Sequence, residues 1–318
     1  MRTPATVAAA LVLLAGPALA DYPQRPVTLI VPWAAGGGTD AVGRMLAQEL
    51  QGALGQPVNV VNREGAGGIV GHTAMIEAAP DGYTIGLATA EITTYAAIGS
   101  SSITAEQMTP IALINFDAAA FNIAANSPWQ TVEEALADIG ANPGRYLASG
   151  MPVGAAYHLA FAGFMQAHGV DPLALTMVPS QGAAPGFQEL AAGGVHVVPS
   201  SLPEAQPMRD AGRVRTLAVL SAERLESFPD VPTVAEATGT PVVGGTWRGI
   251  VGPAGLPDEV VARLEAAVQV GYDSAAFQEF MASRGFGMQF MPAGDFGAFM
   301  AAAAATNADV IETLGLAQ

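Results

Sequence analysis

Cysteine is absent from the 318-residue chain, and so is lysine. Without cysteine the protein has no disulfide, no thiolate nucleophile and no thiolate metal ligand. Its positive charge comes from 12 arginines against 28 acidic residues, which gives a formal net charge of −16. This balance disfavours nucleic acid and anionic membranes as partners. It leaves room for a local anion site, because exposed charges are screened beyond about 8 Å at physiological salt.

Signatures of catalysis and of metal binding are also missing. The four histidines show no H-E-x-x-H spacing, and no G-x-S-x-G nucleophile elbow occurs. We therefore expect no metal, no cofactor and no enzymatic activity. One rival is a nucleotide-dependent enzyme, because Gly36-x-Gly38-x-x-Ala41 formally matches the dinucleotide fingerprint. Against it, four residues separate the preceding strand from the first glycine, and the second strand ends in Asn62-Arg63 instead of an acid.

The first 20 residues have the pattern of a signal peptide. Arg2 precedes a short apolar run, and Ala18-Leu19-Ala20 forms an A-x-A cleavage site. The run is shorter than the roughly 18–20 residues that span a bilayer, although a retained membrane anchor is the alternative. The pattern predicts export to the periplasm and cleavage after Ala20.

The mature chain opens with a strand that runs into a glycine-rich loop and a helix. Residues 27–31 are apolar and β-rich, Gly36 to Gly38 follow, and apolar residues then recur at helical spacing as far as Gly55. Glycines let the backbone approach a ligand closely, and a helix N-terminus offers unpaired N–H groups with a positive dipole end. This arrangement favours an anion.

The order of elements predicts two α/β lobes. Strands at 58–61 and 84–89 alternate with helices, so the loops around Trp33, Asn62 and Thr89 are expected to face one cleft. Residues 110–125 cross to a second α/β unit, residues 246–251 cross back, and the remainder is expected to be helical. The prediction is a hinged clamp, with lobe I at 21–120 and 245–318 and lobe II at 121–244.

Several motifs together resemble one family. They are Val31-Pro32-Trp33 with Gly36-Gly37-x-x-Asp40, Asn62-Arg63-x-Gly65-Ala66-Gly67-Gly68, Pro80-Asp81-Gly82-Tyr83, and Pro229-Asp230-Val231-Pro232-Thr233. In these the chain resembles the substrate-binding proteins of tripartite tricarboxylate transporters, the Bug family. The resemblance implies a type II periplasmic binding protein, each lobe a doubly wound sheet flanked by helices. It also implies a protein that captures a small carboxylate between its lobes and delivers it to a membrane permease. We expect this protein to be a monomer. An exported sensor that presents its ligand to a membrane signalling partner would use the same fold.

The candidate ligand-binding residues lie on loops of both lobes. Trp33 is either a ligand-stacking wall or a core aromatic, Asp40 either a helix cap or a ligand contact, and Glu91 either a site residue or a solvated surface acid. His158 is expected to pack on its helix. The full set is Trp33, Ala34, Gly37, Gly38, Thr39, Asp40, Thr89 and Glu91 in lobe I, with Ser149, Gly150, Val153, Gly154, Ala155, Gln181, Gly182 and Ser200 in lobe II.

Lobe II departs from the family pattern. Ala155 stands where the family usually has a hydroxyl, and Pro152, which lacks an N–H donor, stands where it usually has glycine. Ser180-Gln181-Gly182 replaces tyrosine-lysine-glycine, and Ala162 replaces a common glutamate. A hydrogen bond to a charged group contributes about 1.5–3 kcal/mol. We therefore expect a ligand with one carboxylate held by lobe I and a less polar end in lobe II.

Overall fold

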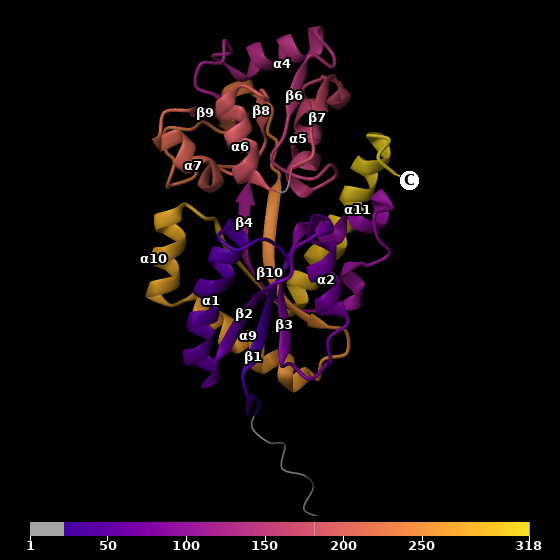
Figure 1. Ribbon diagram of the computed structural model, residues 1–318, viewed down its shortest axis with the longest axis vertical. Helices are drawn as coiled ribbons and strands as arrows, with labels where there is room; N and C mark the ends of the chain where they lie inside the picture. Colours follow the sequence, from indigo (N-terminus) through magenta and orange to yellow (C-terminus); the bar gives the residue numbers. More distant parts are fainter. Residues whose placement is uncertain (1–21, 181, 318) are drawn as a thin grey trace, which may run out of the picture.

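A computed structural model describes residues 22–180 and 182–317 of the chain. It contains two lobes, one above the other in Figure 1, and each lobe has its own β-sheet flanked by helices. The predicted signal peptide, its cleavage site and Gln181 lie outside the described residues.

The lower lobe in Figure 1 is built on a six-stranded sheet with the order β11-β4-β10-β3-β1-β2. Its strands are β1 (Val27–Val31), β2 (Val58–Asn62), β3 (Thr84–Thr89), β4 (Met108–Ala118), β10 (Gly245–Pro253) and β11 (Met288–Pro292). Its helices are α1 (Gly38–Leu54), α2 (Ile69–Ile76), α3 (Tyr95–Ile98), α9 (Asp258–Tyr272), α10 (Ala275–Arg284) and α11 (Ala293–Thr313), with short 3-10 turns at Ala66–Gly68, Ala90–Thr93 and Ala105–Gln107.

The first strand and helix of this lobe form as the sequence predicts. β1 pairs in parallel with both β2 and β3, so its apolar residues are covered on both faces. On α1, Val42, Leu46 and Leu50 are fully buried, which places the apolar stripe of the helix on the sheet. Gly55 ends the helix in the left-handed conformation, with φ of 69°.

The upper lobe has a five-stranded sheet with the order β7-β6-β8-β5-β9. Its strands are β5 (Ala120–Ala124), β6 (Tyr146–Ala148), β7 (Leu175–Met177), β8 (Val197–Val198) and β9 (Val214–Val219). Its helices are α4 (Val132–Ala141), α5 (Ala156–Ala167), α6 (Ala183–Ala192), α7 (Leu202–Asp210) and α8 (Val234–Thr238), with a 3-10 turn at Pro172–Ala174. Phe121, Phe161 and Phe164 pack together in its core, with ring centroids 4.9–5.9 Å apart.

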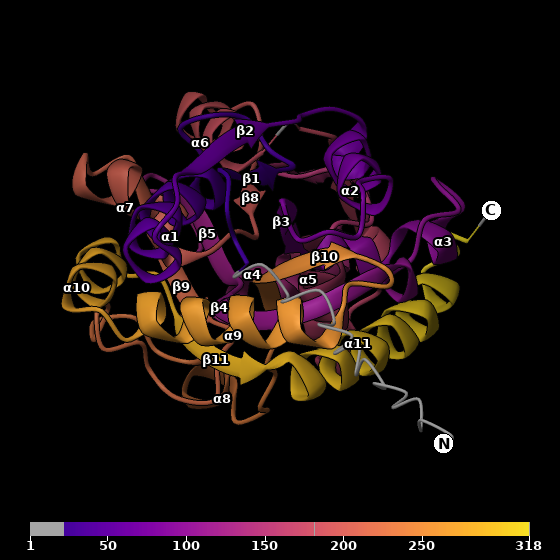
Figure 2. The ribbon, with the colours of Figure 1, turned by 90° about the horizontal axis from the view of Figure 1, so that it is seen from below.

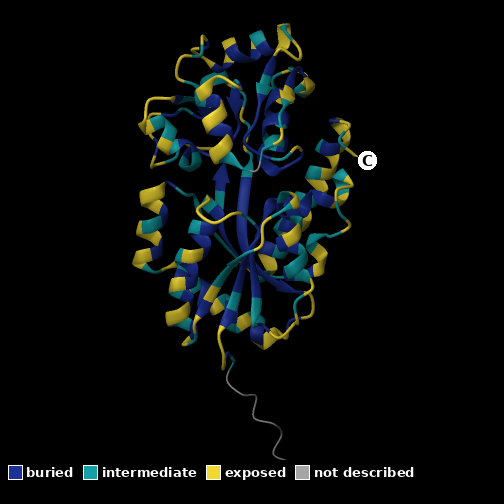
Figure 3. Cartoon of the chain, in the orientation of Figure 1, coloured by how far each residue is buried: buried dark blue, intermediate teal, exposed yellow. Residues whose placement is uncertain are grey.

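The chain passes between the lobes at two places. β4 in one sheet leads directly to β5 in the other, and β10 returns the chain after β9. β4 and β10 are paired, and Figure 3 shows both as mostly buried where they run between the lobes. A buried apolar cluster on α5 and at the end of α11 also joins the lobes, through Leu159, Ala162, Ile311 and Leu314. The exact residue limits of the two lobes stay a prediction.

The fold class is confirmed, with two refinements. Each sheet is mixed, because antiparallel strands adjoin its parallel pairs. The expectation that the chain is entirely helical after β10 is wrong for β11, which pairs antiparallel with the edge of β4. The strand begins shortly after Gly285, which ends α10 with φ of 69°. In the view from below, β11 and α11 lie on the same side of the lobe as α9 (Figure 2). Within 22–180 and 182–317, no helix has the length and apolar character that crossing a membrane needs.

Candidate functional site

The loops that follow β1, β2 and β3 are joined by hydrogen bonds. Trp33 donates its indole N–H to Thr89 Oγ1 at 3.2 Å, and Asn62 donates to the carbonyl of Trp33 at 2.9 Å. The hydrogen bond to Thr89 fixes the indole ring at the edge of the sheet. Trp33 is partly exposed, so it is not part of the buried core. The three loops therefore meet at one place, as the strand order predicts.

Asp40 organises the glycine-rich loop before α1. Its carboxylate accepts the Gly36 N–H at 2.8 Å, Arg44 Nε at 2.9 Å and Asn62 Nδ2 at 2.8 Å. Burial would raise the pKa of this carboxyl, but the bonds from Arg44, Gly36 and Asn62 outweigh burial and hold the pKa below its usual value. The helix N-cap is Gly37, with no side-chain cap. Asp40 is therefore not the N-cap residue: it fixes the glycine-rich loop from the first turn of α1, and its role as a ligand contact stays a prediction.

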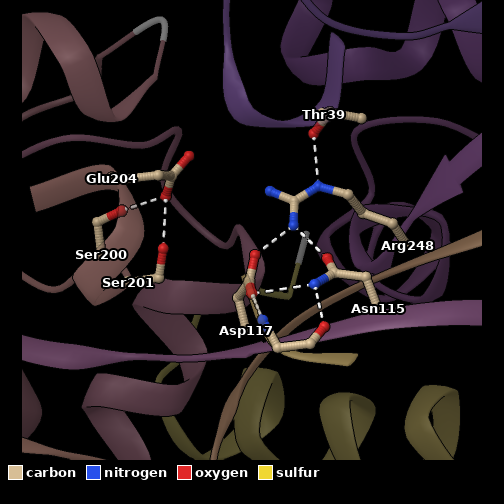
Figure 4. A network of polar contacts seen from close by, with 8 residues as sticks. Thr39, Asn115, Asp117, Ser200, Ser201, Glu204 and Arg248 are labelled. Carbon is tan, nitrogen blue, oxygen red and sulfur yellow. Dashed lines mark hydrogen bonds and ion pairs between the residues drawn. The ribbon is translucent and has the colours of Figure 1, made fainter. Parts of the chain in front are cut away.

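Arg248 on β10 is the residue of this region that the sequence analysis missed. Its side chain is 3% exposed, and its guanidinium binds Thr39 Oγ1 through Nε at 2.9 Å. Nη1 contacts Asn115 Oδ1 and the carboxylate of Asp117 (Figure 4). Burial works against the charge, but Asp117 reverses the effect and raises the pKa of Arg248. A charged residue inside the apolar run 246–251 is the sequence signal that could have revealed it.

The position of Arg248 leaves one of its nitrogens available. A β-bulge follows Arg248 in the pairing of β10 with β4, and bulges re-aim the side chains beside them. Nη2 has no hydrogen-bond partner among the described residues, and in Figure 4 no dashed line leaves this nitrogen. A Cβ built on Gly38 would lie 3.3 Å from Nη2, so the first residue of α1 adjoins it. The site thus combines an arginine N–H group with a helix N-terminus.

Glu91 is a buried acid, so the alternative of a solvated surface acid is wrong. It is 8% exposed and accepts Thr89 Oγ1 at 2.5 Å. Burial raises its pKa, and the Thr89 hydroxyl and the N–H groups of Glu91 and Ala156 partly oppose this. Ala156 is the first residue of α5 in the other lobe. The carboxyl group of Glu91 therefore lies between the two lobes.

His72 on α2 holds the backbone of Thr89 in place. Thr89 donates its backbone N–H to His72 Nε2 at 3.2 Å, so the ring proton is on Nδ1, which lies 3.0 Å from the carbonyl of Gly68 and from Tyr95 Oη. The ring is fully buried, and burial lowers the pKa of His72 to about 4. A neutral imidazole thus fixes Thr89, which contacts both Trp33 and Glu91.

In lobe II, the loop from Ser149 to Ala155 leads into α5. The Ser149 hydroxyl is buried and has no hydrogen-bond partner within the described part of the chain. Ala155 is the N-cap of α5 and provides no side-chain cap. Gly154, with φ of 79°, donates its N–H to His158 Nδ1 at 2.8 Å, and burial lowers the pKa of His158 to about 4. His158 therefore packs on its own helix, as predicted.

The other predicted residues of lobe II differ in their surroundings. A Cβ on Gly186 would lie 2.3 Å from Gly150 Cα, so Gly150 packs against α6. Val153 is 39% exposed, and Gly182 is the N-cap of α6. Ser200 donates to Glu204 at 2.5 Å. Ala162, counted above among the departures that affect the ligand, instead packs against α11.

The loops of the two lobes touch each other over the site. A Cβ on Gly67 would lie 3.6 Å from Pro152 Cγ, and one on Gly154 only 2.3 Å from Ile98 Cδ1. Two pockets lie elsewhere: one between α11 and residues 92–110, the other around Asp117 and Gly287. Neither is lined by a predicted ligand-binding residue. No cluster of three potential metal ligands occurs in the described ranges.

Two α/β lobes, joined by paired strands and meeting over a buried polar junction, define a two-lobed solute-binding protein. Residues 42–316 match the model of the tripartite tricarboxylate transporter family receptor. The chain belongs to this family, as its motifs predict. The family consists of solute-binding receptors, which answers the alternative of a nucleotide-dependent enzyme.

Relatives of known structure share the fold over nearly the whole chain. Rpa4515 of R. palustris, solved with adipate, is 28% identical, covers 93% of this chain and 99% of its own, and has a TM-score of 0.84. MatC of Rhodopseudomonas palustris, solved with malate, is 27% identical, with coverages of 91% and 100% and a TM-score of 0.79. Among relatives compared by sequence, Protein BugT of Bordetella pertussis is 31% identical over 279 residues, which are 86% of this chain and 84% of BugT.

Proposed function

We propose that this protein captures a small organic carboxylate between its lobes. The observation that carries the proposal is Arg248, whose Nη2 lies beside the N-terminus of α1 with no partner among the described residues. A guanidinium edge and helix N–H groups are the donors that a carboxylate prefers. Malate in the structure of MatC and adipate in that of Rpa4515 support the same ligand class.

The acids around Arg248 favour a ligand with a single carboxylate. Asp117 forms an ion pair with Arg248. Glu204 also interacts electrostatically with Arg248, and Arg248 in turn acts on Glu91. One arginine therefore serves several acids. Among the described residues no second arginine pairs with them, so a second ligand carboxylate would lack a cation of its own beside Arg248. We propose that the rest of the ligand is less polar and lies against lobe II, where Pro152 and Ala155 remove donors.

The receptor would work outside the cytoplasm as a monomer and deliver its ligand to a membrane permease. Family membership supports a transporter partner, and the signal-peptide pattern of residues 1–20 supports export. We also propose that the loops named in the sequence analysis bind this ligand. Measuring complex formation between the loaded protein and permease-containing vesicles would test delivery, and loss of that complex on removing the ligand is the expected result.

The ligand class is tested by thermal shift with residues 21–318. Hexanoate, benzoate, malate, adipate and citrate are the probes, and the neutral hexanamide is the control. A ligand at about 100 times its dissociation constant adds about 2.7 kcal/mol, or roughly 5–10 °C in Tm for a domain of this size. We expect a shift with a monocarboxylate and none with the amide. Calorimetry that finds citrate far tighter than the monocarboxylates would reject a single-carboxylate ligand, and no shift with any acid would reject the function.

A further inference from the structure

Tyr157, the second residue of α5, has a buried hydroxyl that lacks a partner. The side chain is 8% exposed, and its Oη makes no hydrogen bond with any described residue. Buried tyrosine hydroxyls are normally bonded, and leaving one unpaired costs about 1–3 kcal/mol. Such a group calls for a physical explanation.

Charged groups of both lobes influence the ionisation of this hydroxyl. Glu204, Asp117 and Arg248 all act on it electrostatically. Burial, then Glu204 and Asp117, raise the pKa of Tyr157, so the group stays a neutral O–H donor. Ser201 also influences the hydroxyl, and its own hydroxyl donates to Glu204 at 3.3 Å, but no hydrogen bond of normal geometry joins Ser201 to Tyr157.

Arg248 and Tyr157 come from two elements of different lobes that contact each other. Arg248 is on β10 and Tyr157 is on α5, which contacts β10. Each affects the ionisation of the other. Two donors, Nη2 of Arg248 and Oη of Tyr157, are thus unpaired within the described ranges, and the residues next to them in the chain, Trp247 and Ala156, belong to one buried cluster. An acceptor that carries negative charge and has two oxygens satisfies both.

We propose that the Tyr157 hydroxyl donates to the same ligand carboxylate that binds Nη2 of Arg248, so that one carboxylate bridges the two lobes. This inference rests on the proposed function and adds a residue of α5 to it. Closing the lobes on the ligand then satisfies a donor that costs free energy when it has no acceptor. The hydroxyl links ligand binding to lobe closure.

The experiment compares Tyr157→Phe with the wild type by calorimetry, using the tightest monocarboxylate of the screen, and by thermal unfolding without ligand. The substitution removes only an unpaired hydroxyl, so we expect Tm without ligand to stay the same or rise. Affinity for the carboxylate should fall at least about tenfold, the size of one hydrogen bond to a charged group. Hexanamide should not distinguish the two proteins.

Tyr146→Phe is the matched control, because Tyr146 is in the same lobe and its hydroxyl donates to Asp138 at 2.6 Å. It should lower Tm and leave the affinity unchanged. If Tyr157→Phe binds the carboxylate as tightly as the wild type, the inference is overturned while the proposed function stands. If Tyr157→Phe instead lowers Tm like the control and keeps its affinity, the hydroxyl has a purely structural role and the inference is again overturned. Failure of the wild type to bind any acid would overturn both.

Discussion

The polar groups of the two lobes differ in how far the protein itself satisfies them. In lobe I, Asp40 accepts three hydrogen bonds, and Thr89 contacts Trp33, Glu91 and His72. In lobe II, Ser149 and Tyr157 keep buried hydroxyls without a partner among the described residues.

This difference indicates a division of labour between the lobes. Apart from Nη2 of Arg248, the donors and acceptors named in lobe I are already paired, so this half-site is rigid and preorganised and gains from the ligand chiefly through that one charged donor. A half-site with unpaired hydroxyls gains free energy only when an acceptor arrives. We infer that lobe I sets the position of the carboxylate and that lobe II responds to its arrival. The following predictions test this comparison.

Acid should weaken lobe I through His72. Its pKa is about 4 in the folded protein and about 6.5 in the unfolded chain, so the unfolded state binds the proton more tightly. The stability from the neutral ring is complete above pH 6.5 and is lost as the pH falls to 4, by about 3 kcal/mol. Denaturant unfolding across this range measures it.

His72→Gln is the comparison for that measurement. Because His158 titrates in the same range, the variant should keep part of the pH dependence and lose the part due to His72. Equal slopes for the variant and the wild type would mean that the folded protein does not hold His72 neutral.

Asp40→Ala should lower the stability of the unliganded protein by about 2 kcal/mol, because it removes a buried acceptor of three hydrogen bonds. Chemical denaturation measures the loss. Asp230→Ala is the control, since the ion pair of the exposed Asp230 with Arg209 should contribute less than about 1 kcal/mol. Unchanged stability together with a lower ligand affinity would make Asp40 a ligand contact.

Ala155→Ser should stabilise the protein by about 0.5–1 kcal/mol. Ala155 is the N-cap of α5 with φ of −69° and ψ of 162°, the extended conformation from which a serine hydroxyl caps a helix. Ala183→Ser, at the first helical residue of α6, should give no such gain. Thermal unfolding measures the stability of both variants. Equal stability changes in the two would show that the missing N-cap of α5 has no energetic cost.

Local patterns predicted the fold well. Glycines at helix ends and apolar runs act through neighbouring residues, so Gly55 and the strand at 27–31 could be recognised from the sequence. The Arg248 network could not, because its partners Thr39, Asn115 and Asp117 lie 209, 133 and 131 residues away in the chain. Tyr157 resembles core filling in an apolar helix, and only the tertiary structure reveals its unpaired hydroxyl. For Glu91 the sequence predicted the place but not the burial.

The apolar seam between α5 and the end of α11 restricts how the clamp can work. Leu159 and Ala162 on one lobe meet Ile311 and Leu314 on the other, and all four are at most 6% exposed. Pulling the lobes straight apart would expose this seam to water, at about 25 cal/mol for each Å². Rotation about a line that passes along the seam and the paired strands β4 and β10 leaves it intact. We infer that α11 lies along the hinge axis together with β4 and β10, and that the two lobes separate on the side away from α11.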